Sequence, residues 1–297
     1  MTKSQSYSIF VPEIWSPRVS EFFKAHLPIR KWFGDECDYS DGVANGGDKV
    51  WIPKLSEAFT VVDIPTTSGD VTATNVNDTK TYLTIDTWKG ASTYFSDFQI
   101  AQIMDNYRVQ EKYADTIAYQ LGKKFTTDLL DLTSNITDSV GDSATDLCST
   151  SIEKALSILQ SNSIPKEDCV MFMHPYAYWR ELMKIQKYYD ASQFGKPSVP
   201  QGFHDLLYGI PVVVSELVPA GTAGTEGGHR NFIVDRKNFF AYAFGNIGGS
   251  EINEFNVPVR IQEVRSSEAL RTKLSGDIMY GKSYIRANAG VRIISKN

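Results

Sequence analysis

The chain has 297 residues, of which 42% are hydrophobic and 22% charged, and its formal net charge is −5. This composition predicts a folded globular protein, and the acidic balance disfavours a general nucleic-acid binder. Cys37, Cys148 and Cys169 are scattered, which predicts no disulfide framework and a reducing compartment. We expect no secretory leader and no membrane contact, because no apolar run approaches the roughly 18 residues of a membrane helix.

Residues 1–47 are expected to form an N-terminal arm with little independent structure. X-Pro steps interrupt it, and residues 19–26 are its one candidate for a short helix. The arm carries Trp15, Trp32 and Phe33. An irregular segment this aromatic is expected to lie against a protein surface.

Residues 48–95 predict a long two-stranded β-ribbon with a polar tip at residues 63–78. The first strand is expected at residues 49–62, interrupted at Pro53, and the second at residues 80–95. In that arrangement Val50, Trp51, Ile52, Phe59 and Val61 would face Tyr82, Leu83, Ile85, Trp88 and Tyr94. A lone hairpin is marginally stable in water, so the ribbon is expected to need a partner surface.

Residues 96–132 predict one long amphipathic helix. Ser96 and Gln99 have the spacing of a capping box, and no proline interrupts the stretch. Apolar residues then recur at helical spacing, namely Ile103, Tyr107, Ala114, Ala118, Leu121, Phe125 and Leu129. At about 1.5 Å per residue the helix would be roughly 50 Å long. Its apolar stripe must be covered by a distant part of the chain or by another copy.

A polar linker at residues 133–146 is expected to lead into a compact α/β module. The module would begin with a helix capped by Thr150 and Glu153, and a second helix would run from Pro175 to Tyr188. Its strands are expected at residues 169–173, 210–215, 232–235 and 239–244, with a glycine-rich loop at 221–228. Closing strands follow from residue 251, including 279–285 and 290–294.

One motif match is literal, because the run from Gly276 through Gly281, Lys282 and Ser283 satisfies G-x-x-x-x-G-K-[ST]. A phosphate-binding loop needs a helix directly after it. The residues that follow Ser283 are instead β-prone and end in Val291, Ile293 and Ile294. We therefore expect a strand whose glycines allow close backbone approach.

No other group of residues predicts chemistry. His26, His174, His204 and His229 lack the spacing of a zinc site, and no nucleophile elbow is present. Asp128 and Asp131 lie three apart on the long helix, where a solvated face is expected. We predict no catalytic residue, no cofactor site and no metal site.

The order of these parts resembles the major capsid protein of tailed bacteriophages, of the Hong Kong 97 type. The run from Tyr208 through Gly-Ile-Pro-Val-Val-Val to Ser215 resembles the G-x-P-V sequence with which a strand of the axial domain begins in that family. The resemblance implies an α+β fold with an N-terminal arm at 1–47 and an extended loop at 48–95. A peripheral domain at 96–148 and 251–297 would carry the spine helix, and an axial domain at 149–250 would be inserted into it.

The resemblance also implies a function. The chain would be the coat subunit that assembles, as hexamers and pentamers, into an icosahedral head around double-stranded DNA. It would be made in the host cytoplasm and reside in the virion, with portal and a separate scaffolding protein as partners and weak, non-specific DNA contact. Some relatives cross-link a loop lysine to a neighbour's asparagine; Lys54, Lys80 and Asn288 are present, but spacing assigns them no role.

Two alternatives stay open at this stage. An encapsulin-type compartment shell would use the same fold around cargo enzymes, and neighbouring genes would distinguish it from a phage head. A nucleotide hydrolase would use Lys282, and measured ATP binding would reveal it.

Overall fold

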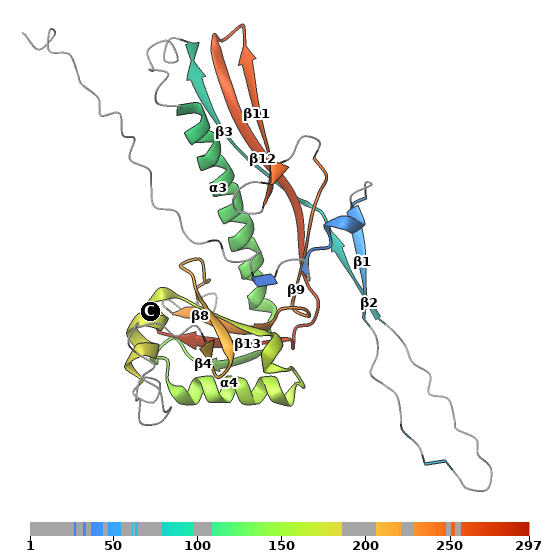
Figure 1. Cartoon of the computed structure of the whole chain (residues 1–297), viewed down its shortest axis with the longest axis vertical. Helices are drawn as coiled ribbons and strands as arrows, with labels where there is room; N and C mark the ends of the chain where they lie inside the picture. Colours follow the sequence, from blue (N-terminus) through green and yellow to red (C-terminus); the bar gives the residue numbers. More distant parts are fainter. Residues whose placement is uncertain are drawn as a thin grey trace, which may run out of the picture.

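The structure is a computed structural model. It describes residues 27, 32–33, 37–43, 47–54, 61, 63–64, 79–97, 109–185, 206–220, 228–247, 251–252 and 257–296. Figure 1 shows a long helix beside an elongated sheet, a module built on a second sheet at one end, and a ribbon that projects from the side. The α+β architecture is the predicted one.

The elongated sheet is built around one strand, β12 (Arg271–Tyr284). Its first part pairs antiparallel with β3 (Thr87–Ser96) on one side and β11 (Pro258–Ser266) on the other, and β10 (Glu251–Ile252) pairs with β11. Its last five residues pair with β9 (Phe240–Phe244). Strand β12 therefore pairs with a strand, β3, whose partner residues lie 175 to 193 positions earlier in the sequence.

Helix α3 (Val109–Leu130) packs on one face of this sheet, as Figure 1 shows. Side chains of β12 alternate between buried and half-exposed, as they must on a strand with one covered face. The Phe125 ring lies 4.9 Å from that of Phe244, 5.1 Å from Tyr280 and 5.5 Å from Tyr242. These aromatic contacts form the centre of the main core.

The long helix was predicted from Ser96, and that start is wrong. Ser96 is the last residue of β3, where it pairs with Arg271. Residues 98–108, including Gln99, lie outside the described residues, and the helix gives way to a 3-10 turn, η4 (Asp131–Asn135). The described helix is about 33 Å long at about 1.5 Å per residue. The predicted stripe is confirmed at its buried members, Ala118, Leu121, Phe125 and Leu129.

The second sheet has six strands in the order β4 (Asp138–Gly141), β13 (Gly290–Ser295), β8 (His229–Asp235), β5 (Cys169–Met173), β7 (Ile210–Val214) and β6 (Leu206–Leu207). Helix α4 (Ser149–Ser161) buries Ile152, Ala155 and Leu159 against it. All five residues of β5 are buried, which explains its continuous apolar run.

Several elements around this sheet differ from expectation. The supposed linker contains β4, and the closing strand β13 pairs with β8 and β4 instead of extending the elongated sheet. Strand β9, expected in the α/β module, pairs with β12. Cys148, not Thr150, is the N-cap of α4. The helix after Pro175 becomes a π turn, η6 (Ala177–Glu181), then a 3-10 turn, η7 (Leu182–Lys184).

The ribbon is shorter than predicted. Strands β1 (Lys49–Lys54) and β2 (Thr79–Thr84) pair antiparallel with Trp51 opposite Tyr82, as expected. The predicted second strand breaks after Thr84, and its remainder is β3, so Trp88 and Tyr94 lie opposite Met279 and Lys273. Phe59 and most of the tip lie outside the described residues, and Val61 is exposed.

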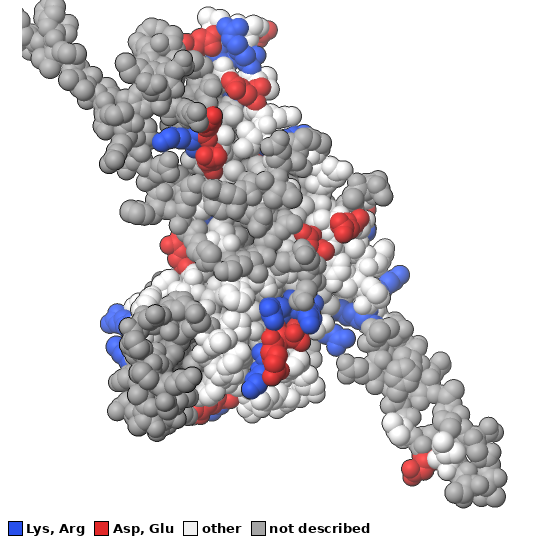
Figure 2. Space-filling view, in the orientation of Figure 1, with Lys and Arg blue, Asp and Glu red and all other residues white. Residues whose placement is uncertain are grey.

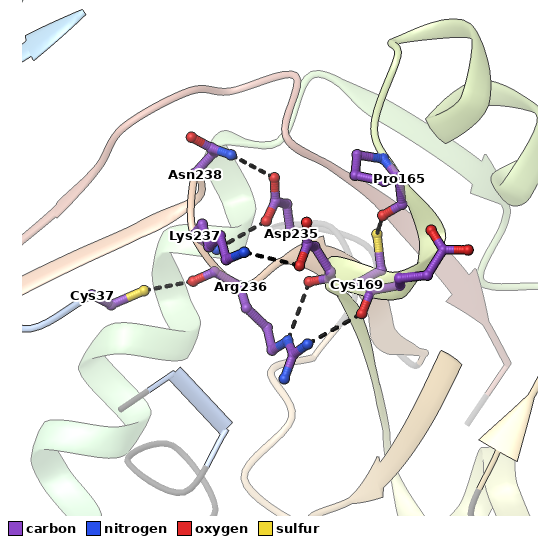
Figure 3. A network of polar contacts seen from close by, with 9 residues as sticks. Cys37, Pro165, Cys169, Asp235, Arg236, Lys237 and Asn238 are labelled. Atoms are coloured by element: carbon purple, nitrogen blue, oxygen red, sulfur yellow. Dashed lines mark hydrogen bonds and ion pairs between the residues drawn. The ribbon is translucent and has the colours of Figure 1, made fainter. Parts of the chain in front are cut away.

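The described end of the N-terminal arm packs against the body of the subunit, as expected, and buries Phe33 in the core. The Phe33 ring stacks on Phe172 of β5 at 5.5 Å and meets Phe240 of β9 edge-on at 4.7 Å. Cys37 is also buried, and its thiol donates to the Arg236 carbonyl at 2.7 Å (Figure 3). The arm therefore fills the junction between the two sheets. Its first 26 residues, with the predicted helix, lie outside the described residues.

Polar contacts fix the turn that joins β8 to β9, as Figure 3 shows. The Asp235 carboxylate accepts hydrogen bonds from the Lys237 amide at 2.9 Å and from the Asn238 side chain at 2.7 Å. Arg236 donates to the carbonyls of Glu167 and Asp168 at 3.1 and 3.3 Å. The turn is thereby tied to the loop before β5, and one chain segment can pass from one sheet to the other.

Gly281 sets the distance between β12 and the ribbon. A Cβ added there would lie 2.3 Å from the Thr84 carbonyl oxygen, whereas one at Gly276 would lie 2.5 Å from a methyl of Ile117. A side-chain methyl can move more easily than a strand backbone. We therefore expect Gly281→Ala to destabilise the fold by about 1–3 kcal/mol, and Gly276→Ala by less. Urea denaturation, monitored by tryptophan fluorescence, measures the loss of stability in both variants. Equal midpoints for Gly281→Ala and the wild type would contradict this account.

Candidate functional site

The nucleotide-like motif lies entirely within β12. Gly276 pairs with Ala91 and Ile261 in the neighbouring strands, and Gly281 pairs with Ala243. Lys282 donates from Nζ to the backbone carbonyl of Asp128 at 2.6 Å. A phosphate cradle needs unpaired amides that lead into a helix. The expected strand with closely approached glycines is confirmed.

Asp128 is the polar tie between α3 and β12. Its carboxylate accepts a hydrogen bond from the Tyr280 hydroxyl at 2.6 Å and pairs with Lys124 at 2.7 Å. Burial by itself would raise the pKa of Asp128, but these two hydrogen bonds and the nearby Lys282 hold it below its ordinary value. The residue is buried, so the solvated face expected for it is wrong, whereas Asp131 is exposed.

None of the three cysteines forms a disulfide, and two of them are buried. Burial, with the nearby Asp235 and Asp168, raises the pKa of Cys169 to about 12, so its thiol stays protonated at neutral pH. Cys148 is exposed, and hydrogen bonds with Ser151 and Thr150 lower its pKa.

His174 and His229 stack face to face with ring centroids 3.5 Å apart. Burial, and then the second imidazole, lower the pKa of His174 to about 4, so His174 is neutral at pH 7. His26 and His204 lie outside the described residues. Within the described part of the chain, His, Cys, Asp and Glu form no group of three that could hold a metal ion.

The outer face of the ribbon exposes aromatic side chains. Trp51 and Tyr82 pack edge to face with centroids 5.4 Å apart, yet they remain 53% and 54% exposed. The Lys80 ammonium lies 4.3 Å from the Trp51 ring centroid. The inner face instead buries Ile52 and Leu83 against a small cluster that includes residues of β9. The ribbon therefore has one covered and one uncovered face.

The elongated sheet has the same asymmetry, because the face opposite α3 carries exposed aromatic residues. Trp88 is 69% exposed, and its indole N–H donates to Asp277 at 2.9 Å. Arg260 donates two further hydrogen bonds to Asp277, at 2.9 and 2.7 Å. Tyr94 is half exposed under the Arg271 guanidinium, which lies 4.3 Å from its ring centroid. Exposed aromatic side chains on an uncovered sheet face make this face a candidate interaction surface.

Of the three residues considered for a cross-link, Lys54 and Asn288 line one open pocket and Lys80 lies over Trp51. No helix in the described residues is both long and apolar enough to cross a membrane.

Known protein-family models do not match this chain, and neither do the curated protein sequences. Solved structures do. A structure from Mycobacterium phage Che8 matches with a TM-score of 0.74 at 18% identity, covering 97% of this chain and 98% of that one. The capsid of the cyanophage P-SCSP1u matches with a TM-score of 0.72 at 13% identity, over 100% and 97%. The mature capsid of bacteriophage PhiM1 gives 0.71 at 12% identity, over 97% and 92%.

These likenesses cover almost the whole length of both partners, and their TM-scores describe a shared fold. The chain therefore has the Hong Kong 97-type phage capsid fold, and the predicted fold class is confirmed. Sequence identities of 12–18% explain why the likeness is visible in three dimensions only.

Removal of the Lys282 ammonium tests the structural interpretation of the motif. Lys282→Ala leaves the Asp128 carbonyl without its side-chain donor, so we expect a loss of about 1–3 kcal/mol in the free energy of unfolding. Calorimetry should detect no ATP binding before or after the substitution. Lys89→Ala, an exposed residue of β3, is the control. Micromolar ATP binding that disappears with Lys282 would refute the assignment.

The histidine pair predicts acid sensitivity. The pKa of His174 falls from 6.5 in the unfolded chain to about 4 in the fold, so the unfolded state binds more protons between these values. The contribution of His174 to the free energy of unfolding should be constant above about pH 6.5. The protein should become less stable as the pH falls from there toward 4. Denaturation midpoints at pH 7.5, 6 and 5, compared with those of His174→Gln, measure it. An equal pH slope in the variant would exclude His174 as the cause.

Proposed function

We propose that the protein is the major capsid protein of a tailed phage, which self-assembles into an icosahedral head around double-stranded DNA. Its place would be the virion, after assembly in the host cytoplasm. The observation that carries the proposal is a full-length likeness to capsid subunits. The faces that one copy leaves uncovered support it, since neighbouring copies would cover them.

The organisation of the subunit is part of this proposal. It comprises an N-terminal arm at 1–47, an extended loop at 48–95, a peripheral domain at 96–148 and 251–297, and an axial domain at 149–250. The projecting ribbon and the one-sided packing of α3 support the loop and the spine helix. Hexamers and pentamers, a portal and a separate scaffolding protein would complete the assembly.

An encapsulin-type shell remains the second candidate, because the same fold would serve it. Particles purified from producing cells separate the two. A phage head should hold nuclease-protected DNA, whereas a compartment should hold a cargo enzyme. A nucleotide hydrolase is not proposed, because the motif that suggested it is the paired strand β12.

Assembly should depend on the exposed aromatic pair of the ribbon. Interface aromatics at the centre of a contact cost about 2 kcal/mol or more when truncated. We therefore expect Trp51→Ser with Tyr82→Ser to lower the yield of closed shells strongly in negative-stain images, with the subunit still folded. Trp179→Ser, which removes a side chain that is 56% exposed in η6, is the control. Wild-type-like shell yield in the double variant would contradict this role.

Contact with packaged DNA should be weak. Two lysines of α3 already have acidic partners, because Lys124 pairs with Asp128 at 2.7 Å and Lys123 with Glu216 at 3.7 Å. The Lys123–Glu216 pair is exposed at both ends and contributes little stability, whereas the Lys124 ammonium pairs from the surface with the buried Asp128 carboxylate; both pairs keep this surface near neutral. Lys123→Gln with Lys124→Gln should leave both shell yield and DNA per particle close to wild type. Normal empty shells with a collapse in DNA content would show that these lysines bind DNA.

A further inference from the structure

A buried carboxylate lies inside the six-stranded module. Glu181 is the last residue of the π turn η6 and is only 4% exposed. Figure 2 shows acidic and basic side chains side by side at the surface of this part of the molecule, where water solvates them. The Glu181 carboxylate instead accepts a hydrogen bond at Oε2 from the amide of Leu147, the residue before the N-cap of α4, at 3.0 Å. An ionised group is costly to remove from water, so its place in the core is a chemical feature that packing alone does not explain.

Glu181 belongs to a network of buried polar groups that joins several elements. The Asn231 carboxamide of β8 accepts a hydrogen bond from the His174 amide at 2.8 Å and donates one to the Ser295 hydroxyl of β13 at 3.1 Å. Asn231 and Ser295 are fully buried, and a hydrogen bond from Ser295 favours the ionised form of the Glu181 carboxylate. The network therefore holds the end of β13, η6 and the start of α4 in one arrangement, and a change at one member affects the others.

The network satisfies one oxygen of this carboxylate and leaves the other unsatisfied. Glu181 Oε1 is buried and has no hydrogen-bond partner in the part of the chain that the structure describes. An unpaired buried acceptor is destabilising, and more so where it carries charge. Burial accordingly raises the pKa of Glu181, although the hydrogen bonds from Leu147 and Ser295 oppose the shift. A proton would remove the charge and turn one carboxyl oxygen into a donor.

Two exposed charges face Glu181 and oppose each other. Asp146, on the segment before α4, raises the pKa of Glu181, and Lys184, at the end of η7, lowers it. Both influences are smaller than burial, which sets the direction of the shift. The titratable residues beside the network on the packed elements are Cys148, His174, Tyr178, His229 and Lys296.

We propose that Glu181 is a proton-operated latch of the six-stranded module. When it is protonated, its carboxyl keeps the bond from the Leu147 amide and buries no charge, so the end of β13, η6 and the start of α4 stay together. When it is ionised, it places a charge with an unsatisfied oxygen in the core, so this edge of the module opens locally more often. The inference concerns the fold of one chain and goes beyond the proposed function, so it does not depend on shell formation.

Acid should close the latch and alkali should loosen it. The pKa of Glu181 is 4.5 in the unfolded chain and higher in the fold, so the folded module binds more protons between these two values. The stabilising effect of the proton is therefore complete below pH 4.5 and is lost as the pH rises through the folded value. His174 acts in the opposite sense, because its folded pKa is the lower one. Its contribution cancels when two chains that both contain His174 are compared at each pH.

Hydrogen exchange of the full-length protein measures this local opening. Protection factors, corrected for the intrinsic effect of pH on exchange, are compared at pH 5 and pH 8 for peptides that contain Leu147, Glu181 or Ser295. Glu181→Gln keeps a carbonyl acceptor and carries no charge at either pH. The ratio of its protection to that of the wild type should be about threefold or more higher at pH 8 than at pH 5. Glu167→Gln, which alters an exposed glutamate before β5, is the control, and its ratio should be the same at both pH values.

A second variant tests the latch without a change at position 181. The Ser295 hydroxyl favours the ionised carboxylate, so its removal should raise the pKa of Glu181 further. With His174→Gln present in both chains, Ser295→Ala should therefore move the midpoint of the pH-dependent protection to higher pH. This measurement also decides the question if Glu181→Gln does not fold.

Three results would overturn the inference while leaving the proposed function intact. The first is a ratio for Glu181→Gln that is equal at the two pH values or larger at pH 5. The second is a ratio for Glu167→Gln that changes as much as that for Glu181→Gln, because the effect would then belong to net charge. The third is an unchanged or lowered midpoint for Ser295→Ala. Failure of the protein to form shells would overturn the proposed function and leave the latch untouched.

Discussion

The packing of α3 on β12 is the contact on which the rest of the structure depends. Strand β12 reaches its neighbours closely because it carries glycine where they approach, with Gly276 under Ile117 and Gly281 beside the Thr84 carbonyl. The Asp128 carboxylate and carbonyl then bind Tyr280 and Lys282 of the same strand. One helix and one strand thus form a frame to which β3, β9 and β11 attach by backbone pairing.

The end of the N-terminal arm links this frame to the second sheet. Phe33 contacts Phe172 of the six-stranded sheet and Phe240 of the elongated one, so a single ring bridges the two. These aromatic residues and Phe125 belong to one continuous hydrophobic cluster. Because interiors are densely packed, removal of such a bridge would affect both sheets together. The arm is therefore part of the core at this end, which a count of its prolines and aromatics does not reveal.

The local pattern of apolar residues predicted helices and strands well where one face, or the whole element, is buried. The buried run at Cys169–Met173 and the stripe of α3 from Ala118 to Leu129 both follow from periodicity. Pairing partners did not follow, because β9 and β13 have the same β-prone composition and only tertiary packing assigns each to its sheet. The sequence did not predict the break after Thr84, because Ile85 and Asp86 are compatible with a continuous strand. In the structure the Ile85 amide donates a hydrogen bond to the Asp48 carbonyl at this break.

The surfaces were predictable in kind but not in detail. The sequence indicated that Trp51 and Trp88 are aromatic residues in need of a partner surface. It could not predict the pocket lined by Lys54 and Arg286, because these residues lie far apart in the sequence. Conversely, the literal nucleotide motif was the strongest sequence signal and the least meaningful one. Its glycines allow close packing, and its lysine donates a hydrogen bond to a backbone carbonyl. These structural roles need the same residue types as a nucleotide-binding loop, so the motif alone cannot separate the two.

Magnitudes indicate how such a subunit would assemble. A fully buried aromatic side chain covers about 150–250 Å², so four half-exposed rings, Trp51, Tyr82, Trp88 and Tyr94, offer on the order of 400 Å² in all. A stable two-partner interface needs roughly 800 Å² from each side. The aromatic faces by themselves are too small for a tight dimer, and they lie on two different elements. Surfaces of this size suit several modest contacts to different neighbours. A closed shell then gains its stability from the number of contacts that each copy makes.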